Sequence, residues 1–215
     1  KMRMPWWNEL AHTPFFVYDP RSKRQGERRQ ALVQPAIDLA PTLLDFFDLE
    51  PTPDMTGKVL RDTIARDVPV REAAMFGLHG SNVNVTDGRY VYMRGCADDS
   101  NGPLYEYTLM PTHMRGPFAP RELAVGNVAL CDGFSFTKGC SLMKIEARAA
   151  QGAGPVHEGH RLYDLASDPE QTRPITDPAV EAGMIEHLNR LMTEVDAPAE
   201  QYQRLGLSAD APSPA

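Results

Sequence analysis

The sequence predicts an α/β fold in two parts: the end of a larger α/β domain, made of a strand plus a helix, and then a small antiparallel β-sheet subdomain packed by a C-terminal helix. Three observations support this prediction. A short apolar run at residues 13–19 precedes a helical pattern that follows Asp38, hairpin signals recur after residue 70, and apolar side chains at helical spacing fill residues 177–195.

The first part of the chain contains one predicted strand and one predicted helix. Residues 13–19 are apolar and too short for a helix, which is typical of a buried strand. Residues 20–29 are polar and basic, which predicts a surface loop. Asp38 is placed to cap a helix whose first turn contains Pro41 and which ends before Pro51. A parallel sheet needs more strands than this segment supplies, so we expect an exposed apolar edge where further strands would pair.

The second part is predicted to be antiparallel sheet. Asp87-Gly88 separates two segments that alternate with period two, residues 82–86 and 89–93, which predicts a hairpin with a type I′ turn. Three more short segments have strand patterns, namely residues 104–109, 134–136 and 161–164.

The last predicted element is a helix over residues 177–195. Asp177 is its expected cap, Pro178 its first residue, and Asp196 with Pro198 marks its end. The segment after Gly206 is rich in Ala, Pro and Ser, which is typical of disorder. These changes divide the chain into residues 1–70 (the end of the large domain), 71–200 (the small subdomain) and 201–215 (a tail).

Composition excludes several classes of function. The formal net charge of −7 argues against a nucleic-acid partner, because phosphate binding relies on clustered Lys and Arg. The sequence contains no run of about 18 apolar residues, which a membrane-spanning helix would need. The three cysteines are too few for a disulfide framework, although a bridge between Cys131 and Cys140 is conceivable. We therefore expect a soluble protein, with the cytoplasm favoured over the periplasm.

Four segments in the same order resemble one family. Ile37–Asp45 resembles a D-x-x-P-T-L-L helix, and His12–Tyr18 ahead of it resembles an R/H-x-P-hydrophobic strand. Pro53–Leu60 resembles the loop that follows that helix, and Leu162–Gln171 resembles an LYDLxxDPxE segment before a terminal helix. Together they resemble the C-terminal part of sulfatases and phosphonate monoester hydrolases, members of the alkaline phosphatase-like superfamily.

The resemblance implies a metal-dependent hydrolase of small-molecule sulfate esters, with phosphonate monoesters or phosphodiesters as the alternative substrates. In this family a formylglycine, made from Cys or Ser in C/S-x-P/A-x-R, is the nucleophile, and Ca, Mg or Mn is the divalent metal. None of the three cysteines lies in that motif, and no metal-ligand set is predicted here. The chain also begins without Met, so we expect an upstream N-terminal catalytic domain as its partner.

The resemblance also suggests individual site residues. Lys1 lies eight residues ahead of Glu9, where the family has a Lys that donates to a sulfate or phosphonate oxygen, although a charged terminus gives the same pattern. Trp6 and Trp7 would either wall the substrate pocket or cover the sheet edge. His79 precedes the hairpin and would border the substrate cleft, unless it is a structural histidine.

Two further patterns favour ordinary structure over chemistry. His157–His160 is not H-E-x-x-H and lies in a loop rich in Gly and Pro, so a metal site is not expected there. Asp98-Asp99 precedes Ser100-Asn101-Gly102, which predicts a solvated turn. Residues 201–206 are placed to reach a neighbouring subunit, which leaves a homo-oligomer open. The rival hypothesis to the enzyme is a non-catalytic module that folds alone.

Overall fold

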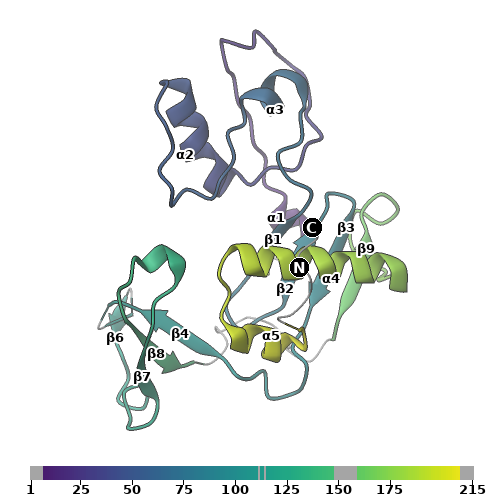
Figure 1. Ribbon diagram of the computed structural model, residues 1–215. Helices are drawn as coiled ribbons and strands as arrows, with labels where there is room; N and C mark the ends of the chain where they lie inside the picture. The colour runs from purple at the N-terminus through teal and green to yellow at the C-terminus, as the bar shows by residue number, and fades with distance from the viewer. Residues whose placement is uncertain (1–6, 111, 114, 148–158, 209–215) are drawn as a thin grey trace. The chain divides into compact units, whose positions relative to one another are not determined.

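A computed structural model describes residues 7–110, 112–113, 115–147 and 159–208. The fold is mixed α/β, with small antiparallel sheets and a C-terminal helix (Figure 1). Contacts divide the chain into two compact units. The first takes in the described residues up to Phe76, then Asn84–Met93 and Arg161–His187, and the second contains the remaining described residues. These units are discontinuous along the chain, so the linear boundaries at residues 70 and 200 stay a prediction.

The first unit is built on a four-stranded sheet of order β1-β2-β3-β9. Strands β3 and β9 pair antiparallel, with Val91 opposite Tyr163. These two residues and Met93 form a buried apolar cluster, which places the core of this unit on β3 and β9. The four strands are β1 (Ala74–Gly77), β2 (Val83–Thr86), β3 (Tyr90–Arg94) and β9 (Arg161–Asp164).

The predicted hairpin is confirmed, but the predicted turn type is wrong. Gly88 has a φ of 94°, whereas Asp87 has no positive φ, and a type I′ turn needs both. The Asp87 carboxylate instead accepts the backbone N–H groups of Arg89 and Tyr90, at 2.8 and 2.6 Å. This side-chain turn closes the loop without a left-handed residue at Asp87.

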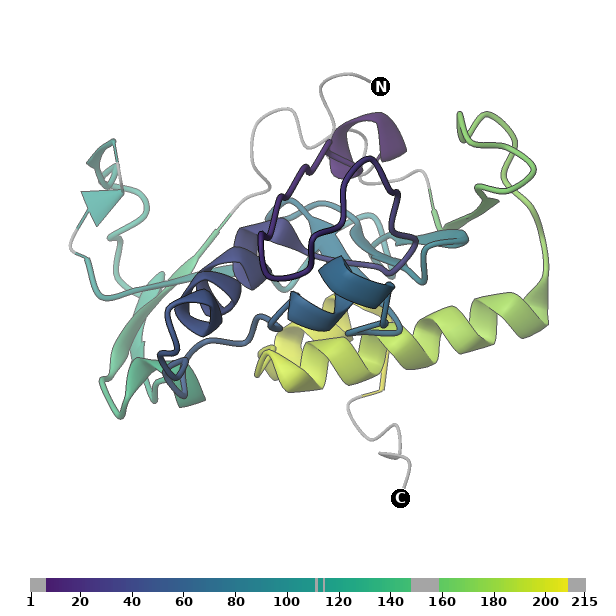
Figure 2. The same ribbon diagram turned by 90° about the horizontal axis from the view of Figure 1, so that it is seen from above.

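Helix α2 (Pro35–Phe46) occupies the predicted place but begins earlier than predicted. Pro35 has the fixed φ that suits a first helical residue, so the helix starts there and Asp38 lies inside it. The prediction that Asp38 is the N-cap residue of this helix is therefore wrong. Two shorter helices of this unit are α1 (Asn8–Ala11) and α3 (Arg61–Arg66), and Figure 2 shows α2 and α3 (dark blue) side by side.

Residues 13–19 are not a strand, which corrects the sequence prediction. A strand forms only when its N–H and C=O groups pair with a neighbour, and no described residue pairs with this segment. Phe16, Val17 and Tyr18 are consequently exposed by 92%, 43% and 63%. The segment therefore has exposed apolar side chains, while the expected sheet edge with missing strands stays a prediction.

Helix α4 (Pro178–Glu194) confirms the helix predicted over residues 177–195. Asp177 Oδ1 accepts the backbone N–H groups of Ala179 and Val180, at 3.1 and 3.2 Å, as expected of a capping residue. The Tyr92 hydroxyl donates to Glu181 at 2.9 Å and holds the first half of α4 against β3.

The second unit contains a three-stranded antiparallel sheet of order β4-β8-β7 and a separate short hairpin, β5 with β6. Residues 134–136, predicted as a strand, instead overlap a 3₁₀ turn over Ser135–Thr137, because Lys138 and Gly139 both have positive φ and reverse the chain there. The elements are β4 (Tyr105–Thr108), β5 (Thr112–His113), β6 (Gly116–Pro117), β7 (Val128–Cys131), β8 (Leu142–Glu146) and α5 (Ala199–Leu205).

Two general expectations can be compared with the described residues. None of their helices is long and apolar enough to cross a membrane. None of the three cysteines forms a disulfide; Cys140 is exposed and the other two are partly buried. The conceivable bridge between Cys131 and Cys140 is therefore not formed.

Candidate functional site

The residues predicted to border a substrate are only partly described by the structure. Lys1 and Trp6 lie outside the described residues, as do His157 and Glu158. Trp7 belongs to the first unit, whereas His79 belongs to the second.

Trp7 covers the sheet of the first unit. Its ring packs edge-on against Tyr163, with ring centroids 5.9 Å apart, and it lies against the buried cluster that contains Val91 and Met93. This packing is what a residue that covers the sheet would make, and it leaves the substrate-pocket role of Trp7 a prediction. Such an edge-to-face pair stabilises the fold beyond the apolar area it buries.

His79 lies between β1 and β2, and its ring is exposed. Its Nε2 atom lies 3.2 Å from the carbonyl oxygen of Tyr105 in β4. The same ring lines an open groove of about 400 Å³ that also contains His113 and Phe118. Sequence reasoning missed His113, because nothing in the pattern of residues 110–118 distinguishes it from an ordinary loop histidine.

Asp38 is the most tightly held charged residue of the first unit. It is fully buried, and its carboxylate accepts two hydrogen bonds from Arg71 at 2.5 Å each. The backbone N–H groups of Lys58 and Gln34 donate to it at 2.8 and 2.7 Å. Burial alone would raise the pKa of Asp38, but the hydrogen bonds from Arg71 and the two N–H groups outweigh it and lower that pKa.

The rest of the D-x-x-P-T segment joins the helix to the loop that follows. The Thr42 hydroxyl donates to the carbonyl of Asp38 at 2.6 Å and accepts the N–H of Leu60 at 3.0 Å. Pro41 has no N–H for the carbonyl of Ile37, four residues earlier. Gly57 approaches this carbonyl so closely that an added Cβ would lie 1.9 Å from its oxygen. The two motif segments therefore form one packed structural unit.

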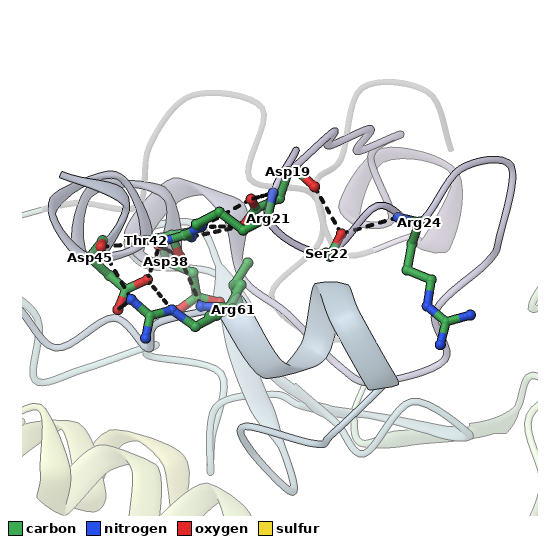
Figure 3. A network of polar contacts seen from close by, with 9 residues as sticks. Asp19, Arg21, Ser22, Arg24, Asp38, Thr42, Asp45 and Arg61 are labelled. Carbon is green, nitrogen blue, oxygen red and sulfur yellow. Dashed lines mark hydrogen bonds and ion pairs between the residues drawn. The ribbon is translucent and has the colours of Figure 1, made fainter. Parts of the chain in front are cut away.

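Arg21 lies between two carboxylates at the surface of the same unit (Figure 3). Its Nε and Nη2 donate to Asp19 at 3.0 and 2.7 Å, and its Nη1 lies 3.3 Å from Asp45. Arg61 also pairs with Asp45, at 2.7 Å, and the Arg21 guanidinium lies 4.7 Å from the ring centre of Phe46. The hydrogen bonds from Arg21 lower the pKa of Asp19.

Beside this network lies an apolar groove of about 230 Å³. Large apolar side chains from residues 15–18 and from α2 form most of its wall. Phe46 and Phe47 are exposed by 38% and 66%, values unusual for a helix that faces a core. Its lining comprises Phe15, Val17, Tyr18, Asp19, Pro20, Arg21, Leu39, Thr42, Leu43, Phe46, Phe47, Leu60 and Ile64.

The LYDLxxDPxE-like segment also has structural roles. Asp168 accepts the backbone N–H groups of Thr172 and Arg173, both at 2.7 Å, which closes a turn. Those bonds lower the pKa of Asp168, led by the bond from Arg173. Gln171 is buried, and its Oε1 accepts the N–H of Asn8 at 2.6 Å, which ties the start of α1 to this turn.

The described residues contain no group of three or more His, Cys, Asp or Glu side chains that could hold a metal ion. Asp98 forms a turn, as predicted, with its carboxylate accepting the N–H and hydroxyl of Ser100. His160 Nδ1 accepts the N–H of Gly95 at 3.2 Å. These side chains do not form the ligand set that the divalent metal implied by the resemblance would need.

Comparison with protein-family models gives no match for this chain, and comparison with curated proteins gives none either.

Proposed function

We propose that this chain is the C-terminal portion of a metal-dependent sulfuric ester hydrolase, whose formylglycine and metal ligands lie upstream of Lys1. Phosphonate monoester or phosphodiester hydrolysis is the alternative within the same superfamily. In the intact enzyme Lys1 would donate to an oxygen of the transferred group.

The observation that carries this proposal is the uncovered apolar surface of the first unit. Residues 15–18 and the outer face of α2 expose side chains that a protein of this composition would bury. An apolar segment that pairs with no described strand, next to a helix with an exposed apolar face, fits the end of an α/β domain whose remaining strands are supplied from elsewhere. A module that folds alone would not need such a surface.

The internal consistency of the motifs adds support. Asp38, Thr42, Gly57 and Leu60 come from two of the four family-like segments and contact one another directly. Segments that resemble one family and also pack together favour a common origin over chance. These contacts support the fold that the resemblance implies, whereas the chemistry rests on residues outside this chain.

The experiment is the intact mass of the native polypeptide, followed by peptide mapping. We expect a species well above 23.9 kDa, with a formylglycine in its N-terminal part. In that enzyme, Lys1→Ala should lower kcat for a sulfate ester by about a hundredfold, as removal of a charge-stabilising donor does. Lys23→Ala, a change in an exposed loop, is the matched control and should leave kcat unchanged.

Two results would overturn the proposal. A native species at 23.9 kDa without a second chain would support the non-catalytic module. A longer native chain without formylglycine would point to another reaction within the superfamily.

A further inference from the structure

Strand β4 is an edge strand of the second unit, because among the described residues it pairs only with β8, in the order β4-β8-β7. In an antiparallel ladder the N–H and C=O of one residue point to the same side, and the side alternates along the strand. The carbonyl of Leu104 accepts the N–H of Ala147, next to β8, at 3.0 Å. Residues 104, 106 and 108 therefore face β8, and Tyr105 and Tyr107 direct their main-chain groups to the open edge.

The main-chain groups of Tyr105 and Tyr107 at the open edge differ in their partners. His79 Nε2 lies 3.2 Å from the carbonyl of Tyr105, which fixes the direction of that edge independently. Among the described residues, nothing pairs with the N–H or the C=O of Tyr107. An incoming strand would satisfy both groups with a single residue, as in a hydrogen-bonded antiparallel pair.

The groove of about 400 Å³ is lined by all four residues of β4, by His79, and by Thr112 and His113 of the β5–β6 hairpin. His113 of that hairpin contacts two carboxylates, Glu122 at 2.7 Å and Glu106 at 3.6 Å. Phe118 packs edge-on against the His113 ring, with centroids 4.5 Å apart. The Glu106 side chain is 39% exposed. Because Glu106 is next to Tyr107 in the strand, its side chain would lie on the same face as those of the two peptide residues that flank the residue paired with Tyr107.

We propose that the open edge of β4 binds an extended peptide segment of another protein, which adds a strand beside Tyr107 and places a basic side chain against Glu106. The unpaired main-chain groups supply the hydrogen bonds. The carboxylates of Glu106 and Glu122 favour Lys or Arg over Asp or Glu at the flanking position. This inference concerns the second unit and does not depend on the proposed hydrolase activity.

The test is selection of peptides from a random phage-displayed library on the full chain, followed by affinity measurement with synthetic copies. We expect enriched peptides with a basic residue next to the pairing position. N-methylation of the pairing residue removes its N–H and should weaken binding about tenfold. Glu106→Gln should weaken binding about fivefold, as expected for a partly exposed charge pair. Glu146→Gln, an exposed change on β8 of the same sheet, is the matched control and should have no effect.

Three outcomes would overturn the proposal. Enrichment no greater than on an unrelated protein would mean that the edge binds no peptide. Binding that tolerates N-methylation at every position would place the peptide elsewhere. Concentration-dependent dimerisation that Glu106→Lys abolishes would identify a second copy of the chain as the occupant of this edge.

Discussion

The replacement Asp38→Ala tests the buried carboxylate that joins three segments of the first unit. Asp38 is fully buried and accepts hydrogen bonds from Arg71, Lys58 and Gln34. Alanine removes all of these acceptors but leaves the donors in place. The Arg71 side chain, only 9% exposed, would then keep a charge without this carboxylate partner.

The magnitude follows from what remains unpaired. Breaking one side of a buried ion pair typically costs about 3–5 kcal/mol, because the other charge stays desolvated. The two backbone N–H groups add to this cost unless water reaches them. We therefore expect Asp38→Ala to lower the free energy of unfolding by about 4 kcal/mol, measured by urea denaturation at neutral pH.

The pH dependence gives a second, independent readout. The folded-state pKa of Asp38 is lowered, so its stabilisation is present above the unfolded-state pKa of about 3.9 and is lost as pH falls through the folded value. The difference in unfolding free energy between the wild type and Asp38→Asn should be constant above about pH 5 and should shrink below about pH 4. A difference that grew in acid would contradict this reasoning.

The matched control is Asp62→Ala. Asp62 is an exposed aspartate of α3 that pairs with Arg66 at 2.7 Å, with both side chains more than half exposed. Such a surface pair contributes between 0 and about 1 kcal/mol. If Asp38→Ala cost no more than Asp62→Ala, the buried pair would not hold these segments together, and the structural account of the motif would fail.

Two further predictions concern packing. Gly57→Ala should destabilise the first unit by about 2 kcal/mol or more, because its Cβ would meet the carbonyl of Ile37. Gly183→Ala in α4, whose Cβ would meet nothing within 4 Å, should stabilise the protein by up to about 1 kcal/mol. Thermal unfolding of both variants measures these effects, and equal effects would contradict the close approach of Gly57 to Ile37. Arg204→Met should cost about 2–3 kcal/mol in urea denaturation, since it leaves the buried carbonyl of Ser81 without its two guanidinium donors, and a change under about 0.5 kcal/mol would refute that role.

Elements with strong local signals could be predicted from the sequence. Asp177 followed by Pro178 marks the start of α4, and the Asp87-Gly88 turn marks the hairpin, because both depend on atoms within four residues. The segment at residues 13–19 shows the limit of such signals. Its apolar pattern specifies burial, but strand formation also needs a neighbour, which the segment itself does not contain.

Other features depend on long-range contacts that no local pattern records. Helix α5 is short and largely polar in sequence, yet Arg204 anchors it by donating to Ser81 and Asn101, more than a hundred residues away. The pairing of β4 with β8 likewise joins distant segments. For the same reason His113 could not be recognised beforehand, since its carboxylate neighbours come from β4 and from the loop after β6.

The contacts of the D-x-x-P-T residues give this segment a structural role. Pro41 leaves the carbonyl of Ile37 without a helical donor, and Gly57 is the residue that can lie against it. Asp38 and Thr42 then accept the N–H groups of Lys58 and Leu60, which follow Gly57 in the chain. These residues of the pattern therefore depend on one another through direct contacts. Substitutions at Asp38, Thr42 or Gly57 should therefore lower the free energy of unfolding, which makes this segment a test of the fold and not of the proposed reaction.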